Sequence, residues 1–193
     1  MMIEIRVHGR GGQGVVTAAE LLSVAAFLDG RQALALPSFG SERMGAPVVA
    51  YCRIDDAPIR ARDPVAEPHA VIIQDPTLLL QQADAVFSGL RAPGHVLINT
   101  TRLPRQLPIP PAVGLEHVVA IPASRIAQDH IGRPVPNAAL LGAFAALTGW
   151  VSIDSVLAAI GARFSPPIAA GNEDAAREAF SQVRMLREEP AHA

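Results

Sequence analysis

The sequence predicts an α/β fold in three layers, with a mostly parallel sheet, flanking helices and a C-terminal helical segment. A β-branched segment near the amino terminus is followed by a glycine cluster and then by an apolar, alanine-rich stretch long enough for a helix. Short apolar runs with the length of buried strands recur through the middle of the chain. The residues after Pro136 have helical patterns.

The first three elements are expected to form a βαβ unit. Ile3–His8 is rich in β-branched residues and predicts a strand, and Val15–Leu28 predicts the helix after it. Asp29 and Gly30 end that helix. Gln32–Leu36 predicts a second strand, which we expect to run parallel to the first after a right-handed crossover. The opening of the chain is therefore Rossmann-like.

Further strands are expected in the middle of the chain. The apolar run Val48–Ile54 predicts a third strand, and Ile59–Arg62, after a turn, predicts a short antiparallel partner for it. Other apolar runs have the length of buried strands, at residues 70–73, 85–87, 96–98 and 118–121. Together these segments predict a sheet of about six to eight strands.

Prolines and helices organise the rest of the chain. Four prolines exclude regular structure from Leu103–Ala112, so this segment is expected to be a surface connection. The patterns farther on predict three helices, over residues 137–148, 153–160 and 172–187. Asn137 and Asn172 are the expected N-caps. We expect residues 1–187 to form a single domain and residues 188–193 to be a frayed tail.

Charge and hydropathy exclude several classes of partner. The chain has 193 residues, a formal net charge of −2 and no dense basic block, which argues against nucleic acid and anionic membranes as partners. No apolar run reaches the ~18 residues of a membrane span, and the amino terminus has no secretion signal. We therefore expect a cytoplasmic protein that binds neither nucleic acid nor membrane.

The scarcity of two residue types narrows the chemistry further. Cys52 is the only cysteine, so the chain cannot form an iron–sulfur cluster or a four-cysteine zinc site by itself. All 16 basic residues are arginine, which removes the P-loop lysine and Schiff-base chemistry. The six histidines have no i, i+4 pairing, so no metal site is predicted. Any electron relay must lie on another chain.

The glycine cluster is the candidate binding site. The G-x-G-x-x-G pattern, at the junction of the first strand and the first helix, consists of Gly9, Arg10, Gly11, Gly12, Gln13 and Gly14. Glycines there let the backbone turn sharply and let a phosphate approach the amides at the positive end of the helix. The alternative is that the glycines only permit close packing of strand against helix.

A dinucleotide site also needs an acidic residue at the end of the second strand, to hold the ribose hydroxyls. Here that strand ends in Leu36-Pro37-Ser38. Asp29 has the right spacing from Gly9 but precedes the second strand, which would place it at the far edge of the sheet. The sequence therefore favours a phosphate-bearing ligand without the ribose clamp, or no ligand, over NAD.

Other polar residues also fall near strand ends. Glu42 and Arg43 lie between two glycines in the loop after the second strand, where α/β sheets place ligands. Arg43 is suited to hold a carboxylate or phosphate bidentately, and the alternative is an ion pair with Glu42 or with a neighbouring chain. Asp75 follows another strand, where it faces the same crevice or caps a turn. His8 is interpreted as an ordinary core or loop histidine.

The segment Arg6–Gly14, followed by Thr17-Ala18-Ala19, resembles the opening of the gamma subunit, or gamma domain, of pyruvate and other 2-oxoacid:ferredoxin oxidoreductases. The loop around Glu42 and Arg43 also matches, although Met44 stands where the pyruvate-type pattern usually has a second arginine. The likeness continues in the family's order through Arg53–Asp56, Gln74–Leu78, Ile98–Thr100, Asn137 with Leu141–Ala143, and Asn172 with Ala175-Ala176. It covers almost the whole chain.

The resemblance implies a non-autonomous subunit of a complex that oxidatively decarboxylates a 2-oxoacid and joins the acyl group to coenzyme A. Thiamine diphosphate and iron–sulfur clusters would be held by partner subunits of alpha, beta and delta type. Ferredoxin, or an NAD-reducing flavin subunit, would accept the electrons. The gamma part would contribute structure near the active site and a surface for coenzyme A, for which the site residues are Gly9–Gly14, Glu42 and Arg43.

Several alternatives remain open from the sequence. Pyruvate is the first choice of substrate, and an aromatic 2-oxoacid such as phenylglyoxylate or indolepyruvate is the alternative. A free-standing nucleotide-binding or regulatory module would use the same glycine turn. An NAD-dependent dehydrogenase acting alone is disfavoured by the position of Asp29.

Overall fold

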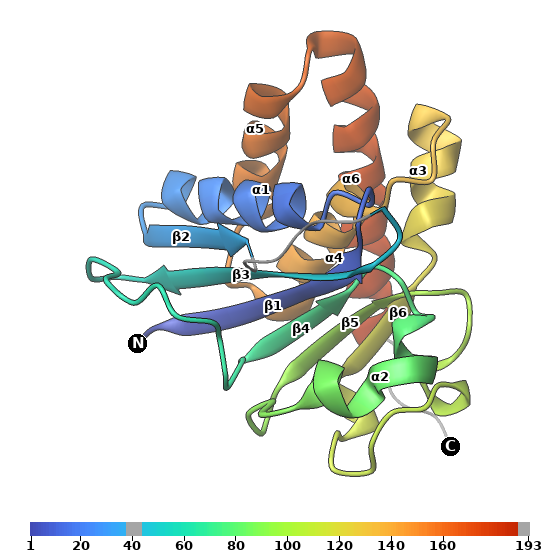
Figure 1. Ribbon diagram of the computed structural model, residues 1–193. Helices are drawn as coiled ribbons and strands as arrows, with labels where there is room; N and C mark the ends of the chain where they lie inside the picture. The colour runs from blue at the N-terminus through green and yellow to red at the C-terminus, as the bar shows by residue number, and fades with distance from the viewer. Residues whose placement is uncertain (38–43, 189–193) are drawn as a thin grey trace.

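The computed structural model describes residues 1–37 and 44–188, and at its centre lies one six-stranded sheet (Figure 1). The strands are β1 (Ile3–Arg10), β2 (Gln32–Pro37), β3 (Pro47–Asp55), β4 (Ala70–Ile73), β5 (His95–Asn99) and β6 (Val118–Ile121). Their order across the sheet is β2-β3-β1-β4-β5-β6, and only β3 runs against the others. The mostly parallel sheet predicted from the sequence is confirmed.

The first two strands of the predicted βαβ unit run in the same direction, as expected, but they are not neighbours in the sheet. Helix α1 (Val15–Leu28) carries the chain from β1 to β2, and both strands run the same way. Strand β3 lies between them and is antiparallel to each, with Cys52 opposite Ile5 of β1 and opposite Ala35 of β2. A strand that comes later in the sequence therefore separates the expected parallel neighbours.

The predicted hairpin after β3 is wrong. Residues 59–62 form no strand, because β3 is already paired along both edges, with β1 and β2. The chain from residue 56 to residue 69 is irregular instead, and the buried Arg53 fixes it. The Arg53 guanidinium donates to the carbonyl oxygens of Ala61 and Asp63, at 3.1 and 2.8 Å.

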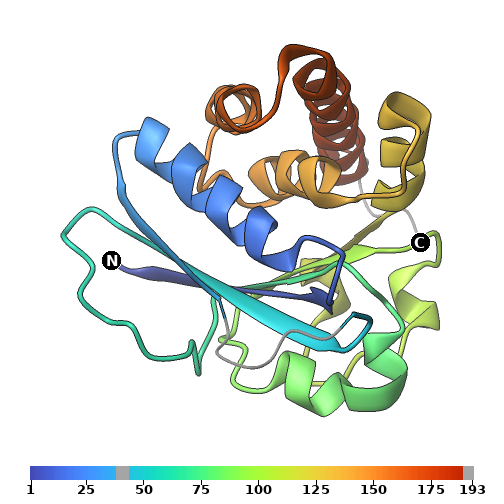
Figure 2. The same cartoon turned by 45° about the horizontal axis from the view of Figure 1, so that its top comes forward.

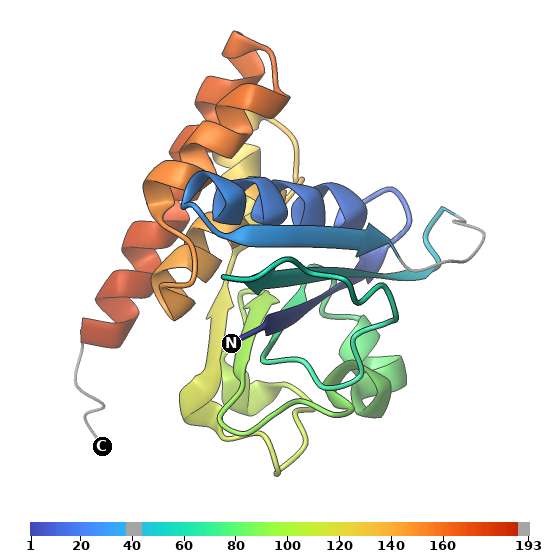
Figure 3. The ribbon, with the colours of Figure 1, turned by 90° about the vertical axis from the view of Figure 1, so that its left-hand side faces the viewer.

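The helices cover the two faces of the sheet unequally. The remaining helices are α2 (Leu78–Phe87), α3 (Ala123–Ile131), α4 (Asn137–Thr148), α5 (Ile153–Arg163) and α6 (Pro166–Glu188). Helices α1 and α3 to α6 lie on one face, whereas α2 and connecting loops lie on the other (Figures 1 and 2). The longest helix, α6, crosses the helical layer from its outer end to the level of the sheet (Figure 3).

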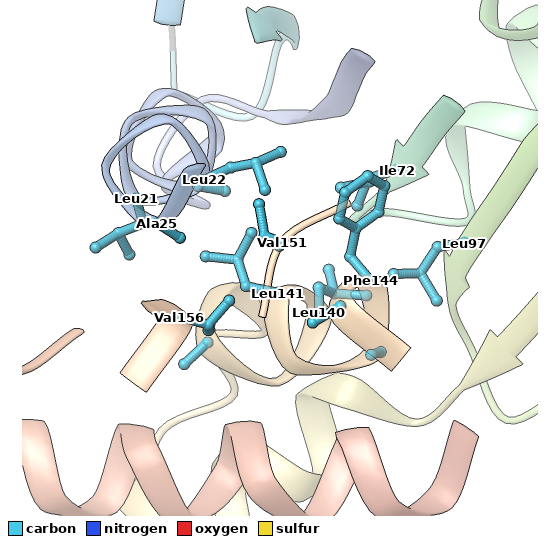
Figure 4. Close-up of a cluster of buried hydrophobic side chains, with 14 of the residues drawn as sticks. Leu21, Leu22, Ala25, Ile72, Leu97, Leu140, Leu141, Phe144, Val151 and Val156 are labelled. Atoms are coloured by element: carbon cyan, nitrogen blue, oxygen red, sulfur yellow. The ribbon is translucent and has the colours of Figure 1, made fainter. Parts of the chain in front are cut away.

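The sheet is buried on both faces, which explains why its central strands are continuous apolar runs. On β4, Ile72 belongs to the core beneath α1 and α4, whereas Val71 and Ile73 belong to the core beneath α2. Figure 4 shows Phe144 of α4 beside Ile72 and Leu97, where the helix packs on the sheet. No helix in the described part of the chain has the length and hydropathy needed to cross a membrane.

Some local predictions need correction. Residues 85–87, predicted as a strand, form the last turn of α2, which belongs to the crossover between the parallel strands β4 and β5, a connection that is usually helical. Helix α6 begins at Pro166 rather than at Asn172, since proline is tolerated in a first turn. Asn172 is buried inside this helix and donates to the carbonyl of Ile168 at 2.8 Å. Asn137 is the first residue of α4 and not its N-cap.

Two connecting segments complete the description. Leu103–Ala112 contains no strand or α-helix, as predicted, and only the short 3-10 helix η1 (Pro104–Gln106). A second one, η2 (Leu115–His117), precedes β6, and α3, which the sequence patterns did not predict, follows that strand. The expected tail lies outside the described residues except for Glu188, the last residue of α6.

Candidate functional site

The glycine turn, residues 9–14, joins β1 to α1 at the carboxyl edge of the parallel strands. The amide of Gly11 donates to the carbonyl of Ala46 at 2.8 Å, and the amide of Gly45 donates to the carbonyl of Gly11 at 3.1 Å. The turn is therefore paired with the chain that leads into β3. Gly12 and Gly14 have φ angles of 89° and 73°, a left-handed conformation that favours glycine.

Two of the glycines are also required for packing. A Cβ atom on Gly9 would lie 2.6 Å from Cγ2 of Val15, and one on Gly14 would overlap Nδ2 of Asn137. That same Nδ2 atom donates a hydrogen bond to the carbonyl of Gly14, at 3.2 Å. Close packing of strand, helix and turn therefore accounts for Gly9 and Gly14 without a ligand, whereas Gly12 faces only the side chain of Met44.

Asp75 connects the glycine turn to the end of β4. Its Oδ2 atom accepts hydrogen bonds from Nε of Arg10 at 3.1 Å and from Nε2 of Gln13 at 2.9 Å. Its Oδ1 atom accepts from the amide and the hydroxyl of Thr77, at 2.9 and 2.6 Å. The Oε1 atom of Gln13 accepts from the amide of Arg10 at 2.7 Å, which closes a ring. We refer to Arg10, Gln13, Asp75 and Thr77 as the Asp75 clasp.

Each of the three guanidinium nitrogens of Arg10 donates a hydrogen bond. Besides Asp75, Nη2 of Arg10 donates to the hydroxyl of Thr77 at 2.8 Å and Nη1 donates to the carbonyl of Gly45 at 3.1 Å. Burial alone would raise the pKa of Asp75, but hydrogen bonds from Thr77 and Gln13 and the charge of Arg10 outweigh it and lower that pKa. Asp75 is thus an ionised carboxylate that caps the turn after β4.

A network of buried amide side chains lies behind the turn. Nε2 of Gln74 donates to Oδ1 of Asn137 at 2.8 Å. Nδ2 of Asn99 donates to the carbonyl of Gln74 and to the hydroxyl of Ser124, each at 2.8 Å, and the amide of Ser124 donates to Oδ1 of Asn99 at 3.0 Å. This network ties the carboxyl ends of β4 and β5 to the amino ends of α3 and α4.

This network was not predicted from the polar residues at strand ends. Gln74 follows β4 directly and Asn99 ends β5, so each polar amide comes immediately after a run of buried apolar residues. That pattern is the signal that could have identified them. Asn137 was expected to cap its own helix, but its side chain instead reaches from α4 to the glycine turn.

Strand β1 carries two buried residues of basic type, Arg6 and His8, on the face of the sheet that α2 covers. Nη2 of Arg6 donates to the carbonyl of Val86 at 3.2 Å and to that of Ser88, at the end of α2. His8 is 5 % exposed, and its Nε2 atom has no hydrogen-bond partner within the described chain. Burial, together with the charge of Arg6, lowers the pKa of His8 to about 3. His8 is therefore a neutral core histidine, as its sequence context suggested.

The candidate ribose acid, Asp29, has a different role. Its Oδ1 atom accepts from the hydroxyls of Ser152 and Ser155 at 2.7 and 2.6 Å, and its Oδ2 atom accepts from the amide of Ser152 at 2.7 Å. Asp29 thus fastens the end of α1 to the start of α5, at the opposite end of α1 from the glycine turn. The topological argument against a dinucleotide clamp is borne out.

The loop candidates Glu42 and Arg43 lie outside the described residues. Within residues 1–37 and 44–188, no group of three or more His, Cys, Asp or Glu side chains is placed to hold a metal ion. Cys52 is buried in β3, and burial raises the pKa of its thiol to about 12, so it is not a reactive thiolate.

Comparison with known proteins gives one consistent family. The model of the pyruvate ferredoxin/flavodoxin oxidoreductase family matches residues 4–182. Pyruvate synthase subunit PorC of Methanothermobacter thermautotrophicus is 46% identical over 186 residues, which are 96% of this chain and 98% of that protein. The common gamma subunit of the pyruvate/ketoisovalerate oxidoreductases of Pyrococcus abyssi is 44% identical over 185 residues, 96% of this chain and 99% of that protein.

The fold leads to the same family. The crystal structure of pyruvate oxidoreductase subunit PORC from Thermotoga maritima superposes with a TM-score of 0.81 at 32% sequence identity. The superposition covers 93% of this chain and 96% of that one. The likeness in sequence and in fold therefore extends over nearly the full length of each protein.

Proposed function

The chain belongs to the pyruvate ferredoxin/flavodoxin oxidoreductase family, and on this premise we propose that it is the gamma subunit of a complex that oxidatively decarboxylates pyruvate to acetyl-coenzyme A. The observation that carries the proposal is the match over 96% of this chain and 98% of a relative named as a pyruvate synthase subunit. In this proposal the chain is one part of an enzyme and does not catalyse the reaction alone.

The reaction divides the chemistry among several subunits. Pyruvate and coenzyme A become acetyl-coenzyme A, carbon dioxide and a proton, and two electrons pass to one-electron acceptors. Thiamine diphosphate would supply the carbon chemistry and iron–sulfur clusters would carry the electrons. Since such a cluster needs several thiolates and Cys52 is the only cysteine here, the residues of this chain do not fit one.

We therefore assign thiamine diphosphate and the clusters to partner subunits of alpha, beta and delta type, with ferredoxin as electron acceptor and the cytoplasm as the compartment. Purification of the native complex through a tag on this chain, with mass spectrometry of what co-elutes, tests the assignment. Recovery of the chain without a thiamine-dependent, cysteine-rich partner would support the free-standing module instead. An NAD-reducing flavin subunit in the eluate would replace ferredoxin as the acceptor.

The substrate is tested on the same purified complex with a panel of 2-oxoacids. We expect the highest kcat/KM with pyruvate. Ketoisovalerate belongs in the panel, because the Pyrococcus abyssi relative is named as a subunit common to pyruvate and ketoisovalerate oxidoreductases. Phenylglyoxylate and indolepyruvate represent the aromatic alternative, and a preference for either would overturn the choice of pyruvate.

We propose further that the glycine turn contacts a phosphate of coenzyme A. Helix α1 begins after Gly14 with no side-chain cap and no acidic residue in its first turn. The amides of a first helical turn have no partner within the helix and carry partial positive charge, which favours an anion there. The contact would comprise Gly9–Gly14, with Glu42 and Arg43 from the following loop. Coenzyme A, when bound, supplies the thiol that receives the acyl group.

Replacement of Gly12 tests this contact. Gly12→Val should obstruct the approach of the phosphate and raise the KM for coenzyme A while decarboxylation continues, because the loss of binding energy that is equal in the ground state and the transition state raises KM without slowing the chemical step. Gly132→Val is the matched control: Gly132 has a similar left-handed φ of 67° and open space around its Cβ position, at the end of α3. Unchanged coenzyme A kinetics in an assembled Gly12→Val complex would refute the contact.

A further inference from the structure

The glycine turn combines freedom in its backbone with fixed side-chain contacts. Gln13 stands between Gly12 and Gly14, whose φ angles of 89° and 73° mark the two points where the backbone changes hand. The amides of Gly11 and Gln13 already donate to the carbonyls of Ala46 and Arg10, at 2.8 and 3.0 Å, so a ligand would meet the neighbouring amides. Glycine residues have the widest conformational choice, so the order of those neighbouring amides depends on the contacts that hold the turn. A binding surface made of backbone amides loses affinity when those amides must be ordered at the moment of binding.

The side chain of Gln13 supplies such a contact, and Asp75 anchors it. Gln13 accepts from the amide of Arg10 at 2.7 Å and donates to Asp75 at 2.9 Å, so it spans the turn from one end to the end of β4. Asp75 in turn holds Arg10 at 3.1 Å. The side chains of Arg10 and Asp75 are only 21% and 13% exposed, which limits the competition of water for this pair.

We propose that Asp75 is a positioning residue for the coenzyme A contact: its carboxylate fixes Arg10 and Gln13, and through them the amides of the glycine turn, without touching the ligand. This inference rests on the proposed contact of the turn with coenzyme A. It assigns Arg10 to the support of the turn, because every nitrogen of its guanidinium already has an acceptor in Asp75, Thr77 or Gly45.

Three variants separate the roles of the carboxylate. Asp75→Ala removes the acceptor for Arg10 and Gln13 altogether. Asp75→Asn keeps one carbonyl oxygen that can accept from both, and so retains part of the clasp. Gln13→Ala keeps Asp75 but removes the link to the turn. Asp84→Ala is the control, since Asp84 is an exposed carboxylate of α2 that lies outside the Asp75 clasp.

The assays use the assembled complex, and they measure the KM for coenzyme A, the KM for pyruvate, and carbon dioxide release in a single turnover without coenzyme A. We expect Asp75→Ala and Gln13→Ala each to raise the KM for coenzyme A on the order of tenfold, the loss of about one charge-assisted hydrogen bond. The KM for pyruvate and carbon dioxide release should stay unchanged. Asp75→Asn should fall between Asp75→Ala and the parent, and Asp84→Ala should match the parent.

The double variant of Gln13 and Asp75 gives the sharpest result. Because Asp75 acts partly through Gln13, the combined substitution should raise the KM for coenzyme A by less than the product of the two single effects. A normal KM for coenzyme A in Asp75→Ala, with a raised one in Gly12→Val, would overturn this inference and leave the proposed contact intact. Equal losses in all three assays, or failure of Asp75→Asn to assemble, would mean that Asp75 only stabilises the fold. No change in either Asp75→Ala or Gly12→Val would remove the contact itself.

Discussion

The buried His8 should make the stability of the chain fall on mild acidification. The pKa of His8 is lowered from 6.5 to about 3, so the folded state keeps this side chain neutral where the unfolded chain takes up a proton. Because the folded pKa lies below the unfolded one, the contribution is present in full above pH ~6.5 and is lost as the pH falls toward 3. At ~1.4 kcal/mol for each pH unit, the full range amounts to about 5 kcal/mol.

A narrower pH range separates the effect of His8 on stability from the effects of the carboxylates. Between pH ~7 and ~5.5 the unfolded histidine takes up most of one proton, which corresponds to a loss of about 1.3 kcal/mol. The lowered pKa values of Asp29 and Asp75 change the free energy of unfolding only near and below pH 3.8, the ordinary carboxyl pKa. The lowered pKa values of His69 and His95 also reduce stability on acidification. Both histidines remain in a His8 variant, so their effects cancel when the variant is compared with the wild type.

The measurement is urea unfolding of the wild-type chain and of His8→Leu at these two pH values. Leucine has a similar volume, and since Nε2 of His8 has no partner in the described chain, its loss leaves no donor or acceptor unpaired there. On acidification from pH ~7 to ~5.5, the free energy of unfolding of the variant should fall by about 1.3 kcal/mol less than that of the wild type. Equal losses in the two proteins would refute the account of a neutral, buried His8.

Two further predictions concern the packing of the fold. Arg53→Met should lower the free energy of unfolding by about 3–5 kcal/mol, because Arg53 is 2% exposed and its ion pair with Glu4, at 2.9 Å, leaves a largely buried carboxylate when broken. Denaturant titration checks this, and a loss below ~1 kcal/mol would show that the pair behaves as a surface contact. Gly142→Ala should destabilise by about 1–3 kcal/mol, since its Cβ would overlap the backbone carbonyl of Ala176 across the α4–α6 contact. The same substitution at Gly161, where only a flexible glutamate side chain lies near, should be neutral or stabilising by up to ~1 kcal/mol; a reversed order of the two variants in thermal unfolding would contradict the packing argument.

Local patterns were sufficient for the elements that depend on their own residues. The apolar runs at 70–73 and 96–98 became β4 and β5, and Val15–Leu28 became α1 with the predicted bounds. The place of β3 between β1 and β2 depends on pairing between distant segments, which no local pattern specifies. The run at 85–87 illustrates the same limit, because a short apolar segment suits a strand or a buried helix equally.

The candidate site was predicted in outline but not in its contacts. The glycine spacing placed the turn correctly. The hydrogen bond between Arg10 and Asp75, in contrast, joins two residues that are 65 positions apart in the sequence. A further arrangement became visible only in the fold. His95 and His117 stand side by side at the amino ends of β5 and β6, with ring centroids 6.4 Å apart, although nothing in their sequence spacing pairs them.

Removal of this chain from a native extract by a specific antibody tests the central claim most directly. The quantity to measure is the reduction of a one-electron acceptor that depends on both pyruvate and coenzyme A, in the depleted extract and in the bound fraction. If the chain is the gamma subunit of the pyruvate-oxidising complex, this activity should leave the extract in proportion to the chain and appear in the bound fraction. Full activity in an extract that no longer contains the chain would contradict the account.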